Sequence, residues 1–339
     1  MPVAAPRSDE ADDRRHDGRL VISLDFELHW GVRDRRSTAS YGANLRGVRD
    51  VVPRMLELFE QRRIRATWAT VGFLMAQDRD ELLEHVPRVR PHYVNPRLDP
   101  YPELAGIGRD ERDDPYHFAS SLVGAIIEAP GQELATHTFS HYYAMEPNIA
   151  LDALAADLEA ALALAARRGV AITSIVFPRN QVSRAALRVC RELGLTAFRG
   201  TEHARYQAPR AGSPSRRVRA ARMVDTYVPL GTHHVARPAL VEGMVNVPAS
   251  RFLRPWRGTV AMLEPLRLAR MLTAMSSAAR SGAVFHLWWH PHNFGVHQDE
   301  NLRVLDRVLC HYDRLRETYG YRSATIHDVA EEYRARIAT

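Results

Sequence analysis

The spacing of apolar and polar residues changes repeatedly along the chain between a strand-like and a helix-like pattern. Short apolar runs predict strands over 20–26, 64–71, 132–136, 171–177, 195–198, 243–247 and 283–289. Apolar residues three or four positions apart predict helices over 48–62, 151–166, 183–193, 263–279 and 301–316. Strands that alternate with helices in this way favour parallel pairing and an α/β architecture.

The number of these strand–helix units indicates the shape of the sheet. About seven units without a second composition regime predict a closed or nearly closed barrel of mostly parallel strands. Active sites of such barrels lie at the carboxyl ends of the strands. The residues that follow each predicted strand are therefore the first candidates for function.

The chain divides into an N-terminal leader and one large domain. Residues 1–18 are rich in charge, so we expect a short disordered leader before a single domain over 19–339. Two segments interrupt the alternation, an irregular insertion at about 78–130 and a basic loop at about 200–222. The arginines of 205–222 have two interpretations, a solvated loop or a flap that meets an anionic substrate.

Composition argues against several classes of function. Apolar residues make up 45% of the chain and charged residues 25%, as in soluble globular proteins. No segment is apolar over the roughly 20 residues that span a membrane, and the N-terminus lacks the apolar core of a signal peptide. We therefore expect a cytoplasmic protein without a membrane span. The net charge of +6 comes from arginines spread among nearly as many acids, which argues against a nucleic-acid partner.

Two acids close the first predicted strand. Asp25 and Glu27 are two residues apart, so their side chains lie on one face while Leu24 and Phe26 lie on the other. Two carboxylates on one face repel each other unless a positive group lies beside them. A metal bound by one acid would remove the repulsion and leave the other ionised as a base. The alternative is a pair of surface acids.

A histidine pair follows the third predicted strand. His137 and His141 are four residues apart, a spacing that lets both bind one metal from a helix or from a turn. Together with Glu27 they would supply three ligands and leave a position for water. Zinc is the divalent metal that we expect, although manganese, iron, nickel and cobalt accept the same ligand types. The alternative is a chance pair.

The last predicted strand carries two further histidines. His290 follows 283–289 directly, and His286 lies four residues deeper on the same face. One of them is a candidate for the catalytic acid or for substrate binding. The other has a second interpretation as a hydrogen-bonded core residue.

Candidate substrate contacts lie in two places. Trp30, Trp288 and Trp289 are candidates for a surface on which a sugar stacks, with core packing as the alternative. Arg179 and Asn180 follow the fourth predicted strand and are candidates for substrate binding.

Taken together, these motifs resemble those of the polysaccharide deacetylase family, also called carbohydrate esterase family four. The acid pair at the end of that family's first strand is similar to 23–27 (SLDFE), and its His-Ser/Thr-x-x-His motif is matched in full by 137–141 (HTFSH). Its second strand is similar to 65–72 (RATWATVG), and its terminal motif to 287–290 (LWWH). The resemblance covers roughly 20–335.

The resemblance implies a fold, an activity and a set of roles. The fold would be a deformed (β/α)7-type barrel, and the activity a metal-dependent removal of N-acetyl groups from amino sugars. Arg179 would orient the catalytic base. The other implied roles are base for Asp25, metal ligands for Glu27, His137 and His141, and general acid for His290.

Three features depart from the family pattern. The acids are spaced Asp-x-Glu instead of adjacent, which is similar to an atypical branch that includes cytoplasmic amide and cyclic-amide hydrolases. Arginine follows proline at 178–179 instead of preceding it. The family's fourth motif, with its Asp and Trp, has no counterpart in the chain.

The function that we predict is removal of an N-acetyl group from an amino sugar by a metal-activated water. A cytoplasmic location favours a small-molecule substrate, namely a nucleotide-sugar, a lipid-linked precursor or a glycosylated metabolite. Two alternatives remain open: a metal-dependent hydrolase of a non-sugar amide, such as a ureide or cyclic imide, and a catalytically silent carbohydrate-binding protein that keeps the metal.

Overall fold

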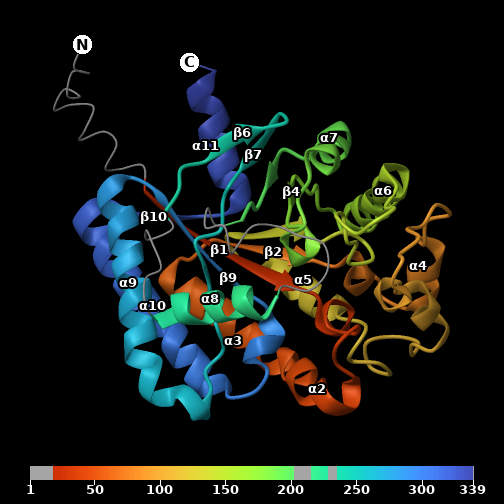
Figure 1. The fold of residues 1–339 in the computed structure, drawn as a ribbon, viewed down its shortest axis with the longest axis horizontal. Helices are drawn as coiled ribbons and strands as arrows, with labels where there is room; N and C mark the ends of the chain where they lie inside the picture. Colours follow the sequence, from red (N-terminus) through yellow and green to blue (C-terminus); the bar gives the residue numbers. More distant parts are fainter. Residues whose placement is uncertain (1–17, 202–214, 228–234, 339) are drawn as a thin grey trace.

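The computed structural model describes residues 18–201, 215–227 and 235–338. A sheet forms its centre and helices surround it (Figure 1). The strands are β1 (Arg19–Phe26), β2 (Ala66–Thr70), β3 (Gln132–Thr136), β4 (Ser174–Ile175), β5 (Ala197–Phe198), β6 (Ala239–Val241), β7 (Met244–Asn246), β8 (Arg251–Phe252), β9 (Val284–Trp289) and β10 (Arg322–Ala324). Their order is β6-β7-β5-β4-β3-β2-β1-β9-β8, with β10 also paired to β1. β6 and β7 are antiparallel and the other pairs are parallel.

The sheet curls into a half-barrel, which confirms the predicted deformed barrel of mostly parallel strands. The segment 247–250 links β5 to β9 where the barrel would close. The N–H of Ala249 donates to Gly200 O (3.0 Å), and the N–H of Ser250 donates to His286 O (2.8 Å). Single hydrogen bonds therefore bridge this gap in place of a strand pair.

β1 lies at the centre and separates two cores. All its residues are buried, and it pairs with β2, β9 and β10. Leu24 and Phe26 join the main core beneath the helices, while Val21 joins a second core on the concave face. Because side chains alternate along a strand, Ser23 and Asp25 share the concave face with Val21. The predicted division of faces in this strand is confirmed.

Helices cover the convex side of the sheet and one end of the half-barrel (Figure 1). Ile326 and Val329 of the last helix, α11, pack into the concave-face core, beside the first residues of β1. Thr325 caps this helix through a capping box. The α-helices are α2 (Thr38–Arg46), α3 (Val48–Arg62), α4 (Arg79–Glu84), α5 (Ser120–Glu128), α6 (Leu151–Arg167), α7 (Arg184–Glu192), α8 (Arg216–Tyr227), α9 (Glu264–Ser281), α10 (Gln298–Tyr319) and α11 (Ile326–Ile337).

Several segments differ from the prediction. Residues 216–222, expected as part of a basic loop, belong to α8, and 202–214 lies outside the described residues. The insertion at about 78–130 contains α4, α5 and short 3-10 turns instead of being irregular throughout. The strands β6, β8 and β10, which are two or three residues long, were not predicted.

Two further expectations concern the ends of the chain and the membrane. Of the predicted leader, residues 1–17 lie outside the described residues. A single domain over 19–339 stays a prediction. Among the described helices, none combines the length and the apolar character needed to cross a membrane.

Candidate active site

The predicted ligands gather at one edge of the sheet. Glu27 directly follows β1, His137 directly follows β3, and His290 directly follows β9. β1 is parallel to β9, and through β2 it is parallel to β3, so all three residues leave the sheet at its carboxyl edge. This is the edge at which barrel enzymes build their active sites.

Glu27, His137 and His141 form a buried group, called here the Glu27 cluster. Oε2 of Glu27 lies 3.1 Å from His141 Nε2 and 3.4 Å from His137 Nε2. All three side chains are at most 4% exposed. The expected convergence of one carboxylate and two imidazoles is therefore confirmed.

The backbone sets the tautomer of His137. Its Nδ1 lies 2.7 Å from Val176 O, and a carbonyl oxygen can only accept, so Nδ1 carries the proton. A neutral His137 therefore turns the lone pair of Nε2 toward the Glu27 carboxylate. Burial lowers the pKa of His141 to about 4, despite its contact with Glu27, so the His141 ring is neutral near pH 7.

The charges of the Glu27 cluster fit a divalent cation. Burial raises the pKa of the Glu27 carboxyl, but the neighbouring histidines outweigh burial and hold that pKa well below its ordinary range. An ionised carboxylate that faces an imidazole lone pair is repelled unless a cation lies between them. Two nitrogens and one oxygen suit zinc and similar divalent metals. The cluster is thus a possible metal site, as the sequence led us to expect.

A turn, and not a helix, presents the two histidines. Thr138 and His141 have φ angles of 65° and 59°, so the backbone here is not helical. Asp157 of α6 fixes the turn, since it accepts the N–H groups of Phe139 (2.7 Å) and Ser140 (3.1 Å) and the Ser140 hydroxyl. Burial raises the pKa of Asp157 to about 6 against these donors. The four-residue spacing allowed either a helix or a turn to present His137 and His141, and in the structure it is a turn.

Asp25 lies beside the Glu27 cluster and has a partner of its own. Arg199 donates from Nη1 to Asp25 Oδ1 (2.6 Å) and from Nη2 to Asp25 Oδ2 (2.8 Å). The same arginine is fully buried, donates to Asn180 Oδ1 (3.0 Å) and lies 4.2 Å from the centre of the Trp288 ring. Burial raises the pKa of Asp25, but Arg199 above all outweighs burial and lowers that pKa. Asp25 is therefore an oriented, ionised carboxylate.

Arg179, which we expected to orient the base, lies elsewhere, so that prediction is wrong. It donates to Asp34 Oδ2, and its guanidinium lies 4.3 Å from the centre of the Tyr143 ring. The orienting residue is Arg199, which directly follows β5. A strand over 195–198 was predicted, so the rule that strand ends carry function already pointed to the residue after it, although Arg199 was not selected. A contact between Arg179 and the substrate stays a prediction.

His290 lies within reach of both acids. Its Nε2 is 3.8 Å from Asp25 Oδ2 and 3.6 Å from Glu27 Oε1, and its side chain is 24% exposed. His292 stands one proline after His290 and was given no role of its own from the sequence. The two rings stack with centres 5.1 Å apart, and His292 Nε2 lies 3.9 Å from Glu27 Oε1. Glu27, His290 and His292 thus form a second set of three possible donors.

His286 is a core residue. It is fully buried, with Nε2 2.8 Å from Ser23 Oγ and Nδ1 3.1 Å from Val247 O. Burial, with a smaller contribution from Arg199, lowers its pKa to about 3. His290 faces the site and His286 does not, so His286 follows the core interpretation, while a catalytic role for His290 stays a prediction. The assignment of His286 to substrate binding is wrong.

Comparison with known proteins extends the resemblance to the whole fold. No family model and no curated protein matches the chain. A solved structure of a candidate polysaccharide deacetylase from Mycobacterium smegmatis matches with a TM-score of 0.55 and 15% identity, covering 99% of this chain and 94% of its own. A second candidate polysaccharide deacetylase, from Pseudomonas aeruginosa PAO1, matches with a TM-score of 0.53 and 12% identity, covering 94% and 91%. The chain has a polysaccharide-deacetylase-like fold.

At these identities the likeness concerns the fold alone. A 4-alpha-glucanotransferase from Thermococcus litoralis matches with a TM-score of 0.51 and 11% identity, covering 93% of this chain and 40% of its own. The deacetylase-like fold therefore has relatives with a different carbohydrate reaction. Function has to be argued from the side chains of the site.

The deacetylase-like barrel buries two of the three candidate tryptophans. Trp30 is fully buried and its Nε1 donates to His117 O (2.9 Å), so its predicted part in sugar stacking is wrong. Trp289 is also fully buried. Trp288 is partly exposed, and its ring centre lies 5.7 Å from that of His290. Of these three, Trp288 alone is placed to contact a substrate, and that role stays a prediction.

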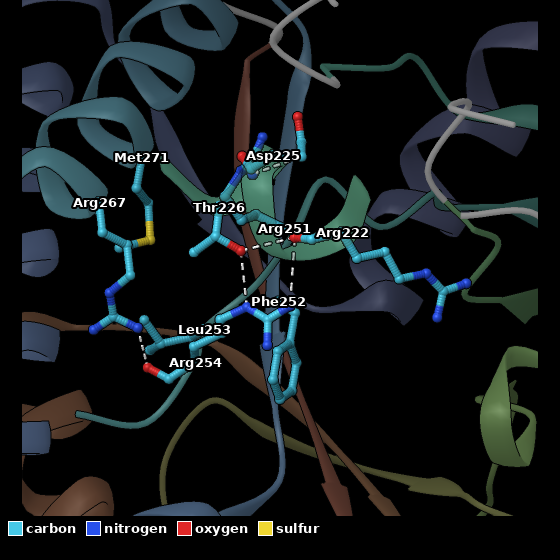
Figure 2. Close-up of a pocket in the computed structure, with 9 residues that line it drawn as sticks. All are labelled: Arg222, Asp225, Thr226, Arg251, Phe252, Leu253, Arg254, Arg267 and Met271. Atoms are coloured by element: carbon cyan, nitrogen blue, oxygen red, sulfur yellow. Dashed lines mark hydrogen bonds and ion pairs between the residues drawn. The ribbon is translucent and has the colours of Figure 1, made fainter. Parts of the chain in front are cut away.

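An arginine-rich pocket adjoins the site of the deacetylase-like barrel. Its volume is about 30 Å³. Phe252 connects it to the site, because this ring lies 4.7 Å from the Trp288 ring and 5.7 Å from the His290 ring, centre to centre. Figure 2 shows the lining, which consists of Arg222, Asp225, Thr226, Arg251, Phe252, Leu253, Arg254, Arg267 and Met271.

The lining of this pocket carries more positive than negative charge. Among the described residues that line it, Asp225 is the one acid, and it accepts hydrogen bonds from Arg251 (3.1 Å) and from Arg270 of α9 (2.6 Å). Arg254 donates to the neutral hydroxyl of Thr226 (2.8 Å; Figure 2). Burial lowers the pKa of Arg254, and repulsion from neighbouring arginines lowers it further. An anion bound there would relieve this repulsion.

Proposed function

We propose that the protein is a metal-dependent hydrolase that removes an N-acetyl group from an amino sugar. One observation carries the proposal. The Glu27 cluster converges on one point, while Asp25 stands beside it as an ionised carboxylate with an arginine partner of its own. A deacetylase-like fold, with these residues at the strand ends, supports the same reaction class.

The side chains divide the proton transfers between them. A divalent cation bound by the Glu27 cluster would supply a Lewis acid and make a water more acidic. Asp25 accepts the proton of that water at Oδ2, the oxygen that lies nearer to His290. The bidentate contact with Arg199 keeps the plane of this carboxylate fixed while it does so. His290 donates a proton from Nε2 to the departing amine, which leaves poorly as an anion.

The arginine-rich pocket favours a substrate that carries an anionic group. Phe252 lines the pocket and its ring centre lies 5.7 Å from that of His290, so the pocket and the site share this side chain. A phosphate bound by this pocket would lie against Arg254 and Arg222. Among the substrates considered from the sequence, a nucleotide-sugar or a lipid-linked precursor meets this condition.

Acetate release from N-acetyl sugars by metal-loaded protein tests the reaction. Asp25→Asn removes the base, so we expect turnover to fall by about 10²–10⁴-fold while elemental analysis still finds the metal. Glu27→Gln should lose metal and turnover together. His85→Gln is the control, because His85 contacts the Glu81 carbonyl of α4, far from the cluster in sequence. Unchanged turnover in Asp25→Asn, or ring opening of imides without acetate release, would sink the proposal.

A separate comparison tests the anionic group. Arg254→Gln should lower kcat/KM for a nucleoside diphosphate N-acetyl sugar, relative to the neutral sugar, by about 10–100-fold, as expected for loss of one charged hydrogen bond. Arg280→Gln, at the exposed end of α9, serves as the control. An equal loss with both substrates would contradict an anion subsite and leave the hydrolase assignment standing.

A further inference from the structure

A second histidine pair lies behind the turn that follows Glu27. His29 belongs to the 3-10 turn Leu28–Gly31, and His117 belongs to the segment before α5. Nδ1 of His29 lies 3.0 Å from Nε2 of His117. Neither side chain takes part in the catalytic steps proposed above, and both are largely buried.

The other nitrogen of each ring has a partner that can only accept. His29 Nε2 lies 3.0 Å from Arg36 O, and His117 Nδ1 lies 2.8 Å from the carboxylate oxygen Oδ2 of Asp114. Each of these two nitrogens must therefore carry a hydrogen. When both rings are neutral, His29 Nδ1 and His117 Nε2 face each other as bare lone pairs. A contact of 3.0 Å between lone pairs is repulsive unless a cation lies between the nitrogens.

We propose that His29 and His117 bind a second divalent transition metal, with Glu103 as the third ligand. A carboxylate oxygen of Glu103 and one nitrogen of each ring lie within 4.8 Å of one another. Two nitrogens at zinc bond lengths of about 2.0–2.1 Å stand about 3.3 Å apart in a tetrahedral site, so the rings need to part by only a few tenths of an ångström. Two imidazoles and a carboxylate suit zinc, cobalt or nickel.

The surroundings of the pair are those of a metal site. Histidine ligands usually donate their second N–H to a carbonyl or a carboxylate, as His29 does to Arg36 O and His117 does to Asp114. Arg33 contacts Glu103 through Oε1 (2.6 Å) and holds the carboxylate beside the rings. Asp114, which contacts His117, is negative, and Arg33, which contacts Glu103, is positive. These two charges cancel, so the negative charge of Glu103 is available to balance a bound cation.

The metal has access to this site. His29 and Glu103 both line a cleft of about 530 Å³, and the Glu103 side chain is 39% exposed. A cation can therefore reach the ligands from solvent without unfolding the barrel. The cleft also leaves space for a water as a fourth ligand.

The second metal would position Glu27 rather than react with substrate. It would tie the turn Leu28–Gly31 to the segment that contains His117, to which Trp30 already donates a hydrogen bond. That turn packs closely on Glu27, because a Cβ added at Gly31 would lie 1.9 Å from Glu27 Cδ. Ordering the turn would therefore restrict the position of the Glu27 carboxylate through its contact with Gly31.

Counting bound metal separates the two sites. The full chain is stripped with a chelator, given Zn²⁺ alone, freed of unbound metal by gel filtration and measured by elemental analysis. We expect two zinc ions for the unchanged protein, one for His117→Gln, one for Glu27→Gln and none for the double variant. Glu27→Gln is chosen because Glu27 belongs to both donor sets at the catalytic edge. His85→Gln should keep two.

Two conservative variants test the second site without replacing a largely buried histidine, in case His117→Gln does not fold. Asp114→Asn keeps an acceptor for His117 Nδ1 and should weaken the second zinc by about 10–100-fold, the usual effect of changing a group that orients a ligand. Glu103→Gln changes a partly exposed residue and should weaken the same zinc, with the first unaffected. If the unchanged protein binds one zinc, which Glu27→Gln removes and His117→Gln does not, the pair holds a proton and the inference is wrong. The proposed hydrolase function would survive that result.

Discussion

Replacing Arg199 by methionine tests whether one buried arginine keeps Asp25 ionised. Methionine has a similar length and no charge, so Arg199→Met removes the bidentate contact while it fills much of the same space. The Arg199 side chain is fully buried and that of Asp25 is 5% exposed. Water therefore cannot replace the lost partner, and Asp25 must either stay as a poorly compensated charge or take up a proton.

The burial of the pair sets the size of the effect. Removing one partner of a buried ion pair costs about 3–5 kcal/mol, because the remaining charge is left without compensation. Arg199 also donates to Ser23 and Asn180, both at 3.0 Å, which places the expected loss in the upper part of that range. The double variant Arg199→Met/Asp25→Asn holds no unpaired charge and should recover most of the loss.

Urea unfolding at several pH values measures these effects. Arg199 lowers the folded-state pKa of Asp25, so the carboxylate stabilises the fold above its unfolded pKa, and this stability is lost as pH falls through the lower folded pKa. Without Arg199 the folded-state pKa of Asp25 rises. The deficit of Arg199→Met should therefore be largest near neutral pH and should narrow as pH falls through the ordinary value of 3.8.

Arg179→Met is the matched control. Its pair with Asp34 is more exposed, at 18% and 10%, so its loss should be on the order of 1 kcal/mol. If Arg199→Met lost no more stability than Arg179→Met, the assignment of Arg199 would fail. It would fail equally if adding Asp25→Asn to Arg199→Met restored nothing.

Three further outcomes follow from the same structure. Zinc at about one hundred times the Kd of the Glu27 cluster should raise the free energy of unfolding by about 2.7 kcal/mol through that site, and Glu27→Gln should abolish this contribution in thermal unfolding. Trp30→Phe should cost about 1–3 kcal/mol in denaturant unfolding without a selective rise in KM, because this side chain packs in the core. Burial holds the pKa of His286 at about 3, below its ordinary 6.5, so neutral His286 stabilises the fold above pH 6.5 and this stability is lost as pH falls toward 3. His286→Gln should lower the slope of unfolding free energy against pH in that window by up to one proton, and an unchanged slope would contradict the assignment.

Residues at the ends of long strands could be predicted from the sequence. β1, β3 and β9 are five to eight residues long, and their apolar runs mark where each strand stops. Parallel pairing then places the next residues at one edge, which is why Glu27, His137 and His290 were found together. Face alternation along β1 added Asp25, because it depends only on counting residues.

Burial by distant segments could not be predicted in the same way. Trp30 is covered by the segment that contains His117, some ninety positions later in the chain. His286 is enclosed by Ser23 and by the bridging segment 247–250, which has no periodic pattern of its own. A tryptophan or a histidine has the same local pattern whether it faces a substrate or the core, so the sequence left both interpretations open.

The division of labour between Asp25 and Glu27 comes from their partners and not from the two acids themselves. Both carboxylates are buried at the end of one strand, and burial alone would raise the pKa of each. Asp25 meets a permanent cation, the guanidinium of Arg199, which satisfies both oxygens and leaves no need for a metal. Glu27 meets the Nε2 atoms of two imidazoles, and a cation bound between them would balance its charge. Replacing His141 by arginine should therefore abolish metal binding at the Glu27 cluster while both acids remain in place.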